Sequence, residues 1–188
     1  SPHLEAARAA GCDVLLLTDA IDQWVVDAIS EYDGCKLRAL DKGDLELGSD
    51  DDKAAAKKSL EEARANLQPL LDFLQATLTD RVREVRLSPR LTDSACCLVA
   101  DADAMNATME RFMKAFEHNA PPQLRILEIN PAHPLISKMS AMREANSTDP
   151  QLANYAELLF AQAQLAEGTV PGDVGRFNKL IATLMAGQ

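Results

Sequence analysis

The clearest indication of the fold lies near the C-terminal end, in the stretch DPQLANYAELLFAQAQLAEG at residues 149–168. Asp149 is a typical helix N-cap followed by proline at the first helical position, and Gly168 is a typical residue for ending a helix. The apolar residues between them recur with the helical period of 3.6, at Leu152, Tyr155, Leu158, Leu159, Ala163 and Ala166. The stretch therefore predicts an amphipathic helix with one continuous apolar stripe.

A second amphipathic helix is expected directly after it, over residues 173–186. Its apolar residues are Val174, Phe177, Leu180, Ile181, Leu184 and Met185. Two short antiparallel helices bury little apolar surface alone, so this hairpin needs a partner surface. The partner can be the domain behind the hairpin or the same hairpin of a second chain. A two-fold four-helix bundle is the simplest arrangement, because one self-complementary patch then serves both copies.

Upstream of the hairpin, the pattern alternates between helices and short apolar strands. Strands are expected over residues 82–87, 96–99 and 124–129, and a short helix over residues 135–144. A long helix precedes them, and Pro69 should kink it because proline removes a backbone hydrogen bond. Its apolar stripe is Leu60, Ala63, Leu67, Leu70, Leu71, Leu74 and Leu78. These elements predict a mixed α+β domain with a three-stranded sheet.

The N-terminal part predicts a smaller unit. The run Val14-Leu15-Leu16-Leu17 is short enough for a buried strand, a helix carrying Trp24 follows, and residues 37–40 are expected to form a second strand after the Asp33-Gly34 turn. This order suggests a β-α-β unit. The acidic stretch at residues 41–52 has the composition of a linker. We therefore predict two domains, residues 1–47 and 48–188.

A methionine-rich helix is expected between the second and third strands of the larger domain. Met105, Met109, Phe112, Met113 and Phe116 share one face of residues 103–116 at helical spacing. Methionine side chains are flexible, so this face can accept partners of different shapes. Periodicity alone favours a helix packed on its own core, and the exposed, partner-binding interpretation stays open beside it.

The composition argues against several classes of function. The 188 residues are 47% hydrophobic and carry a formal net charge of −10, which is typical of a globular protein and argues against a nucleic-acid partner. No apolar run approaches the roughly 20 residues of a membrane span. The cysteines at positions 12, 35, 96 and 97 lack C-x-x-C spacing, and no export signal opens the chain. We therefore expect buried structural thiols and a reducing, cytoplasmic location.

No catalytic centre is indicated. The phosphate-binding, dinucleotide-binding and nucleophile-elbow motifs are absent from the sequence. His3, His118 and His133 lie far apart, and none has a second histidine or a cysteine at metal-ligand spacing. We expect His133, between Ala132 and Pro134, to act in a turn or a hydrogen bond. We therefore predict that this chain binds no metal and is not an enzyme by itself.

Several longer motifs carry a family resemblance. In the N-terminal part they are SPHLE at residues 1–5, VLLLTDAIDQW at 14–24 and EYDG at 31–34. Further on they are RV at 81–82, SPRLTDS at 88–94, MER at 109–111, ILEINP at 126–131, HPL at 133–135 and QAQLAEG at 162–168. Taken in order, they resemble the end of the middle domain and the C-terminal domain of heat-shock protein 90 chaperones. The match runs nearly from end to end.

The resemblance implies an ATP-driven dimeric chaperone whose nucleotide domain lies upstream of Ser1. ATP and magnesium would belong to that domain, so no cofactor is expected within these residues. The residues implied in contacts with nonnative client polypeptides are Trp24, Met105, Met109, Phe112 and Met113. The implied dimer interface contains Leu152, Tyr155, Leu158, Leu159, Val174, Phe177, Leu180, Ile181 and Leu184.

Two functions of different class remain open. In the first, which the resemblance favours, the chain is a homodimer whose methionine helix is exposed and binds nonnative polypeptides. In the second, the chain is a purely structural dimerisation module whose methionine helix is buried. Both readings share the dimer, so the accessibility of the methionine side chains distinguishes them.

Overall fold

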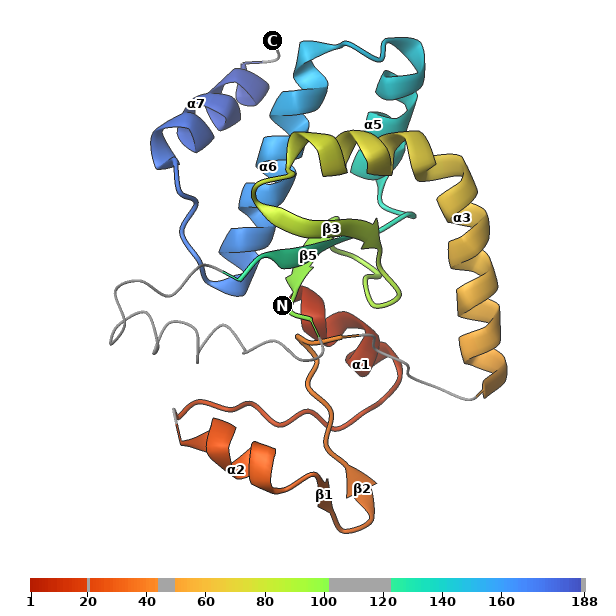
Figure 1. Ribbon diagram of the computed structural model, residues 1–188, viewed down its shortest axis with the longest axis vertical. Coiled ribbons are helices and arrows are strands. Elements are labelled where there is room, and N and C mark those ends of the chain that lie inside the picture. The colour runs from red at the N-terminus through yellow and green to blue at the C-terminus, as the bar shows by residue number, and fades with distance from the viewer. Residues whose placement is uncertain (20, 44–49, 102–122, 187–188) are drawn as a thin grey trace.

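The structure is a computed structural model, and it describes residues 1–19, 21–43, 50–101 and 123–186 (Figure 1). The N-terminal elements are the 3-10 helix η1 (Pro2–Leu4), α1 (Glu5–Ala9), α2 (Asp22–Ala28), β1 (Glu31–Tyr32) and β2 (Cys35–Lys36). The rest of the chain contributes α3 (Asp50–Thr77), β3 (Val82–Leu87), β4 (Cys96–Val99), β5 (Arg125–Ile129), α5 (Pro134–Ala145), α6 (Pro150–Glu167) and α7 (Val174–Met185). The predicted mixed α+β class is confirmed.

The three predicted strands of the larger domain form one mixed sheet in the order β3-β5-β4. Strand β5 runs parallel to β3 and antiparallel to β4, so it is paired on both edges. Every residue of β5 is buried. Because successive side chains of a strand point to opposite faces, Leu127 and Ile129 join the main core, whereas Glu128 points to the other face.

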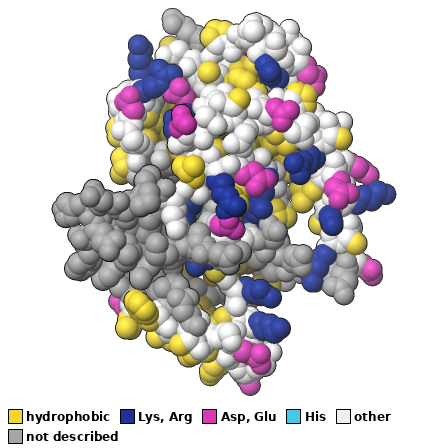
Figure 2. Space-filling view, in the orientation of Figure 1, with side chains coloured by type: hydrophobic (Ala, Val, Ile, Leu, Met, Phe, Trp, Pro, Cys, Tyr) yellow, Lys and Arg dark blue, Asp and Glu magenta, His cyan; other side chains and the backbone are white. Residues whose placement is uncertain are grey.

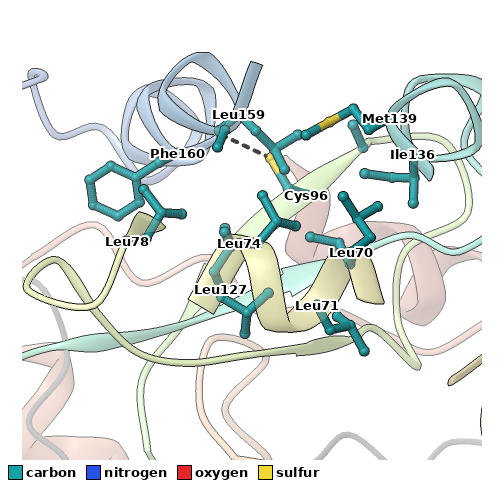
Figure 3. Close-up of a cluster of buried hydrophobic side chains, with 14 of the residues drawn as sticks. Leu70, Leu71, Leu74, Leu78, Cys96, Leu127, Ile136, Met139, Leu159 and Phe160 are labelled. Atoms are coloured by element: carbon teal, nitrogen blue, oxygen red, sulfur yellow. Dashed lines mark hydrogen bonds between the residues drawn. The ribbon is translucent and has the colours of Figure 1, made fainter. Parts of the chain in front are cut away.

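The main hydrophobic core lies between the sheet and helices α3, α5 and α6 (Figure 3). Leu70 and Leu74 of α3 pack near Leu127 of β5, Ile136 of α5 and Leu159 of α6, and all of these side chains are almost fully buried. The predicted leucine stripe of α3 therefore covers one face of the sheet.

Helix α3 contains Pro69, as predicted. Figure 1 shows that the helix bends between its N-terminal half and the half that lies over the sheet. Proline lacks the backbone N–H that would bond to the residue four positions earlier, so a bend is the expected result. The bend places the C-terminal half of α3, with its buried leucines, over the sheet.

The C-terminal helices begin and end as predicted. The Asp149 side chain accepts a hydrogen bond from the Gln151 N–H at 2.9 Å, and Gly168 ends α6 with a φ of 83°. That left-handed backbone is easily adopted only by glycine. Asp173 caps α7 by accepting from the Arg176 N–H at 2.8 Å. The dimeric four-helix bundle stays a prediction, because the structure contains a single chain.

The predicted β-α-β unit near the N-terminus is wrong. Residues 12–18 form no strand, and Leu15 and Leu16 are 70% and 74% exposed. Instead, Asp33 and Gly34 both adopt positive φ angles, of 48° and 75°, and join β1 and β2 in a tight antiparallel hairpin. An extended segment becomes a strand only when a neighbour pairs with its backbone, and among the described residues none pairs with 12–18. The predicted boundary after residue 47 lies outside the described residues.

Candidate functional site

Of the predicted client-contact residues, the structure describes only Trp24. Its side chain is 60% exposed on α2, and Ile21 and Val25 beside it are 64% and 46% exposed. Figure 2 shows hydrophobic side chains gathered over this lower part of the molecule. Met105, Met109, Phe112 and Met113, and the predicted helix that carries them, lie outside the described residues. The exposure of Trp24 is compatible with a contact role, and the methionine face stays a prediction.

The predicted dimer residues of α6 pack within their own chain. Leu152 and Leu159 are 0% and 1% exposed and belong to the main core, and Leu158 is also buried. Tyr155 is partly buried against this core, and its hydroxyl accepts a hydrogen bond from Lys138 Nζ at 2.8 Å. An interface between two chains cannot rest on the accessible surface of Leu152 and Leu159.

The apolar stripe of α7 is only half covered. Leu180 is buried and Phe177 partly buried, because α7 packs on α6 along this edge of the stripe. Val174, Ile181 and Leu184, on the rest of the stripe, are 45%, 37% and 39% exposed. Exposed apolar residues repeating along one helical face are typical of an interaction surface.

A buried network of charged side chains lies on the opposite face of the sheet from the main core. At its centre is Glu128 of β5, which is 0% exposed. Its carboxylate accepts hydrogen bonds from Arg86 Nη2 at 2.8 Å, Arg90 Nε at 2.8 Å and Ser88 Oγ at 2.9 Å. Charge-assisted hydrogen bonds of this length are among the stronger polar contacts in proteins.

Arg90 links this network to the N-terminal part of the chain. Its guanidinium is 0% exposed, and besides Glu128 it donates to the carbonyl oxygens of Leu40, at 2.7 Å, and of Gly43. The backbone between Leu40 and Gly43 also pairs with Ala100, which follows β4. The Ala100 N–H donates a hydrogen bond to the backbone carbonyl of Asp41 at 2.9 Å. Residues 40–43 are thereby joined to the sheet.

The loop that contains Arg90, residues 88–94, is held by a second carboxylate from α1. We call residues 88–94 the junction loop. Glu5 accepts hydrogen bonds from the N–H groups of Thr92, Asp93 and Ser94, at 2.7, 2.8 and 3.1 Å, and from the Ser94 hydroxyl. Burial raises the pKa of Glu5, but the hydrogen bonds from Asp93, Ser94 and Thr92 lower it by a larger amount. The pKa of Glu5 therefore lies below its ordinary value.

His3 lies beside the same network. Burial lowers the pKa of His3; nearby Asp41 opposes this effect, and the charge of Arg90 adds to it. Its Nδ1 atom is buried and has no hydrogen-bond partner among the described residues. The lowered pKa favours the neutral form of the imidazole beside Arg90 and Glu128.

The junction loop is the motif SPRLTDS that carries part of the family resemblance, but its sequence by itself indicates no role for it. One signal was available, because Glu128 stands between Leu127 and Ile129 in a mostly apolar strand. A carboxylate is almost never fully buried without a partner. A glutamate at the centre of a buried strand thus indicates an arginine nearby, and two are found.

The cysteines divide into two pairs. Cys96 and Cys97 are buried as predicted, and the Cys96 thiol donates to the Leu159 carbonyl at 3.2 Å (Figure 3). Burial raises the pKa of Cys96 to about 12, and burial followed by the charge of Glu128 raises that of Cys97. Cys12 and Cys35 are exposed, so the prediction of buried thiols is wrong for them.

His133 caps α5 by accepting from the Leu135 N–H at 3.1 Å, which is the hydrogen-bonding role expected from its sequence context. Within the described part of the chain, no three potential metal-ligating side chains gather in one place. None of the helices described there combines the length and apolarity needed to cross a membrane.

Comparison with known proteins decides the family. The model of the family described as Hsp90 protein matches residues 1–188. The chain belongs to the Hsp90 family. Similar curated proteins include the chaperone protein HtpG of Geobacter sulfurreducens, with 47% identity over 185 residues, 98% of this chain and 28% of that protein. The chaperone protein HtpG of Salinispora tropica is 44% identical over 186 residues, and that of Frankia casuarinae is 42% identical over the same length.

The Hsp90 match confirms the resemblance drawn from the motifs. In both of these further relatives the matched part is 99% of this chain and 29% of the relative. The chain therefore spans somewhat more than a quarter of the length of the curated chaperones it matches.

Proposed function

We propose that the chain is the dimerisation and client-binding portion of an ATP-dependent Hsp90 chaperone that assists protein folding. The observation that supports a dimer is that the apolar stripe of α7 is only half covered. Val174, Ile181, Leu184 and Met185 remain exposed on it, by 45%, 37%, 39% and 84%. A second copy of the same helix is the partner that fits, because a two-fold axis lets one patch cover its own equivalent.

The energetics set the size of this interface. Fully burying a large apolar side chain contributes about 1.5–3 kcal/mol, so covering the remaining exposed part of these side chains contributes roughly 3–6 kcal/mol per chain. Association costs about 4–15 kcal/mol in lost freedom of motion. The free energy gained by covering the α7 stripes of two chains therefore only balances this cost. We therefore propose that the interface extends beyond α7 to the exposed Leu165, in the last turn of α6, and the exposed Val170, in the connection between α6 and α7.

Replacing Ile181 with lysine tests the dimer. The exposed stripe predicts that Ile181→Lys lowers the mass measured by sedimentation equilibrium from that of a dimer to that of a monomer, with unchanged helix content by circular dichroism. Ala182→Lys is the matched control, because it adds the same charge at the neighbouring exposed residue of α7, off the stripe. A wild-type chain that stays monomeric at micromolar concentration, or equal effects of both variants, would contradict the proposal.

For client binding, the proposal assigns contacts to Trp24 and to the face formed by Met105, Met109, Phe112 and Met113. The exposure of Trp24 and the membership of the Hsp90 family support it. A flexible methionine face explains tolerance of unrelated sequences, and two copies in one dimer raise the apparent affinity. A labelled, reduced and alkylated polypeptide serves as the nonnative probe.

Met109→Lys is expected to weaken binding of this probe while leaving the mass of the dimer and the helix content unchanged. Unfolding of the variant would instead place Met109 in the core. Slow oxidation of the methionines by peroxide in the native chain would favour the alternative, a purely structural dimerisation module with its methionine helix buried.

Activity that depends on ATP and magnesium is assigned in this proposal to a nucleotide domain outside these 188 residues. The support is that the chaperones similar to this chain are three to four times its length. The proposal places the whole protein in the cytoplasm, acting on nonnative polypeptides and on neither nucleic acid nor membranes. Nucleotide titration of the 188-residue chain alone should show no binding of ATP.

A further inference from the structure

The described residues between positions 12 and 39 form a separate N-terminal lobe, which contains α2, β1 and β2. None of its described residues is buried. Figure 1 shows the lobe below the sheet, joined to the rest of the molecule by two chain segments. Within the part of the chain that the structure describes, the lobe therefore shares no core with the sheet domain, and its position depends on how these two segments are attached.

Both segments are attached at the junction loop. The first segment continues from α1, where Glu5 accepts from the N–H groups of Thr92, Asp93 and Ser94. The second segment is residues 40–43, where Arg90 donates to the carbonyls of Leu40 and Gly43, beside the backbone pairing with Ala100. The two attachments lie within five residues of one loop, although Glu5 and Gly43 are far apart in sequence.

The loop in turn is fixed to the sheet. Ser88 and Arg90 both donate to Glu128 in the central strand, at 2.9 and 2.8 Å, and the Ser88 N–H donates to the Ile129 carbonyl at 2.8 Å. The arginine and the glutamate are fully buried, so solvent does not screen their interaction. Any displacement of the loop would therefore disturb both segments that lead to the lobe.

We propose that the junction loop is a two-point attachment that sets the position of the N-terminal lobe, with Glu5 and Arg90 as the positioning residues. Loss of either attachment leaves the lobe held by fewer contacts, so it moves more freely while the sheet and helices α3, α5 and α6 stay folded. This role goes beyond dimerisation and client binding: it is a conformational device that governs where the exposed Trp24 lies relative to the rest of the chain.

Trp24 is the single tryptophan of the chain and reports directly on the lobe. The test uses the 188-residue chain and measures two quantities, the slow component of the time-resolved fluorescence anisotropy of Trp24 and the hydrogen exchange of backbone amides. Glu5→Ala removes the first attachment. Arg90→Lys weakens the second while keeping a positive charge beside Glu128, because one ammonium group cannot reproduce the several hydrogen bonds of the guanidinium.

The attachment predicts that Glu5→Ala speeds the exchange of the Thr92 and Ser94 amides at least tenfold and reduces the slow anisotropy component by half or more. Arg90→Lys should do the same for the Gly43 amide and for Trp24. In both variants the amides of β5 should change less than twofold. Glu157→Ala is the matched control, because it removes a partly exposed glutamate that pairs with Arg176 between α6 and α7, away from the loop.

Two results would overturn the inference. If the loop amides exchange faster but the anisotropy of Trp24 is unchanged, the loop does not position the lobe. If the β5 amides accelerate as much as those of the loop, Glu5 and Arg90 support the whole fold and have no separate positioning role. Should Arg90→Lys fail to fold, Glu5→Ala alone decides, because Glu5 lies on the partly exposed edge of the network.

Discussion

Replacing Glu128 with glutamine should strongly destabilise the chain. The glutamate is 0% exposed, and its two oxygens accept from Arg86, Arg90 and Ser88 at 2.8–2.9 Å. Glutamine keeps the shape of the side chain but removes the negative charge and replaces one acceptor oxygen with a donor group. Arg86 and Arg90 would then both lose their ion pair with the buried Glu128 carboxylate.

The expected size follows from this burial. Removing one partner of a buried ion pair costs about 3–5 kcal/mol, because the other charge stays buried without its counter-charge. For a chain of this length, the loss corresponds to a decrease of about 6–20 °C in Tm. Urea unfolding followed by circular dichroism measures the change in the free energy of unfolding, and an unchanged denaturant slope would show that the native surface is retained.

Asp101→Asn is the matched control, since it neutralises the carboxylate of a solvent-exposed pair with Arg83 on the same sheet. Exposed pairs contribute about 0–1 kcal/mol. If Glu128→Gln also lowers the free energy of unfolding by less than about 1 kcal/mol, water reaches the guanidinium groups in solution. The network around Glu128 is then not buried as the structure shows it. Combining Glu128→Met with Arg90→Met should cost less than the sum of the single changes, by about 0.5–3 kcal/mol, because the two side chains interact directly.

Three further changes test other parts of the structure. Gly168→Ala should destabilise the chain by about 1–2 kcal/mol in thermal unfolding, because alanine is strained at the φ of 83° that ends α6. Cys12 should react with a thiol reagent within the native state, whereas Cys96, buried and with its pKa raised to about 12, should react only after unfolding. The pKa of Glu5 is lowered in the folded state, so its stabilising effect should be complete above its ordinary value of 4.5 and be lost as the pH falls through the folded pKa; Glu5→Gln should remove this part of the pH dependence.

The helix ends could be predicted from the sequence because their causes are local. The Asp149 cap, the proline after it and Gly168 act on backbone groups within a few residues, and the structure confirms all three. The leucine stripe of α3 and its proline are confirmed for the same reason. The three strands of the sheet could be recognised from their apolar composition, but their order required contacts between distant parts of the chain.

Features that depend on a partner could not be predicted in this way. The run Leu15-Leu16-Leu17 has the composition of a buried strand, and yet it is exposed because no described neighbour pairs with its backbone. The tight turn at Asp33-Gly34 was recognised, but the pairing it produces is a local hairpin between β1 and β2. Composition indicates what a segment can become, and only the available neighbours decide whether it does.

The two C-terminal helices show the same distinction most sharply. Both have an apolar stripe; periodicity leaves open whether the chain's own domain or a second chain covers it, and the family resemblance implies that residues of both helices form the dimer interface. The structure shows that Leu152 and Leu159 of α6 are covered by their own sheet, whereas Ile181 and Leu184 of α7 remain accessible. An apolar stripe indicates that a helical face will be buried, but it does not indicate which surface will cover that face. The surface left for a second chain is therefore narrower than the sequence suggested. Because burial of the α7 stripe alone only balances the cost of association, a stable dimer would also have to cover Leu165, in the last turn of α6, and Val170, which follows α6.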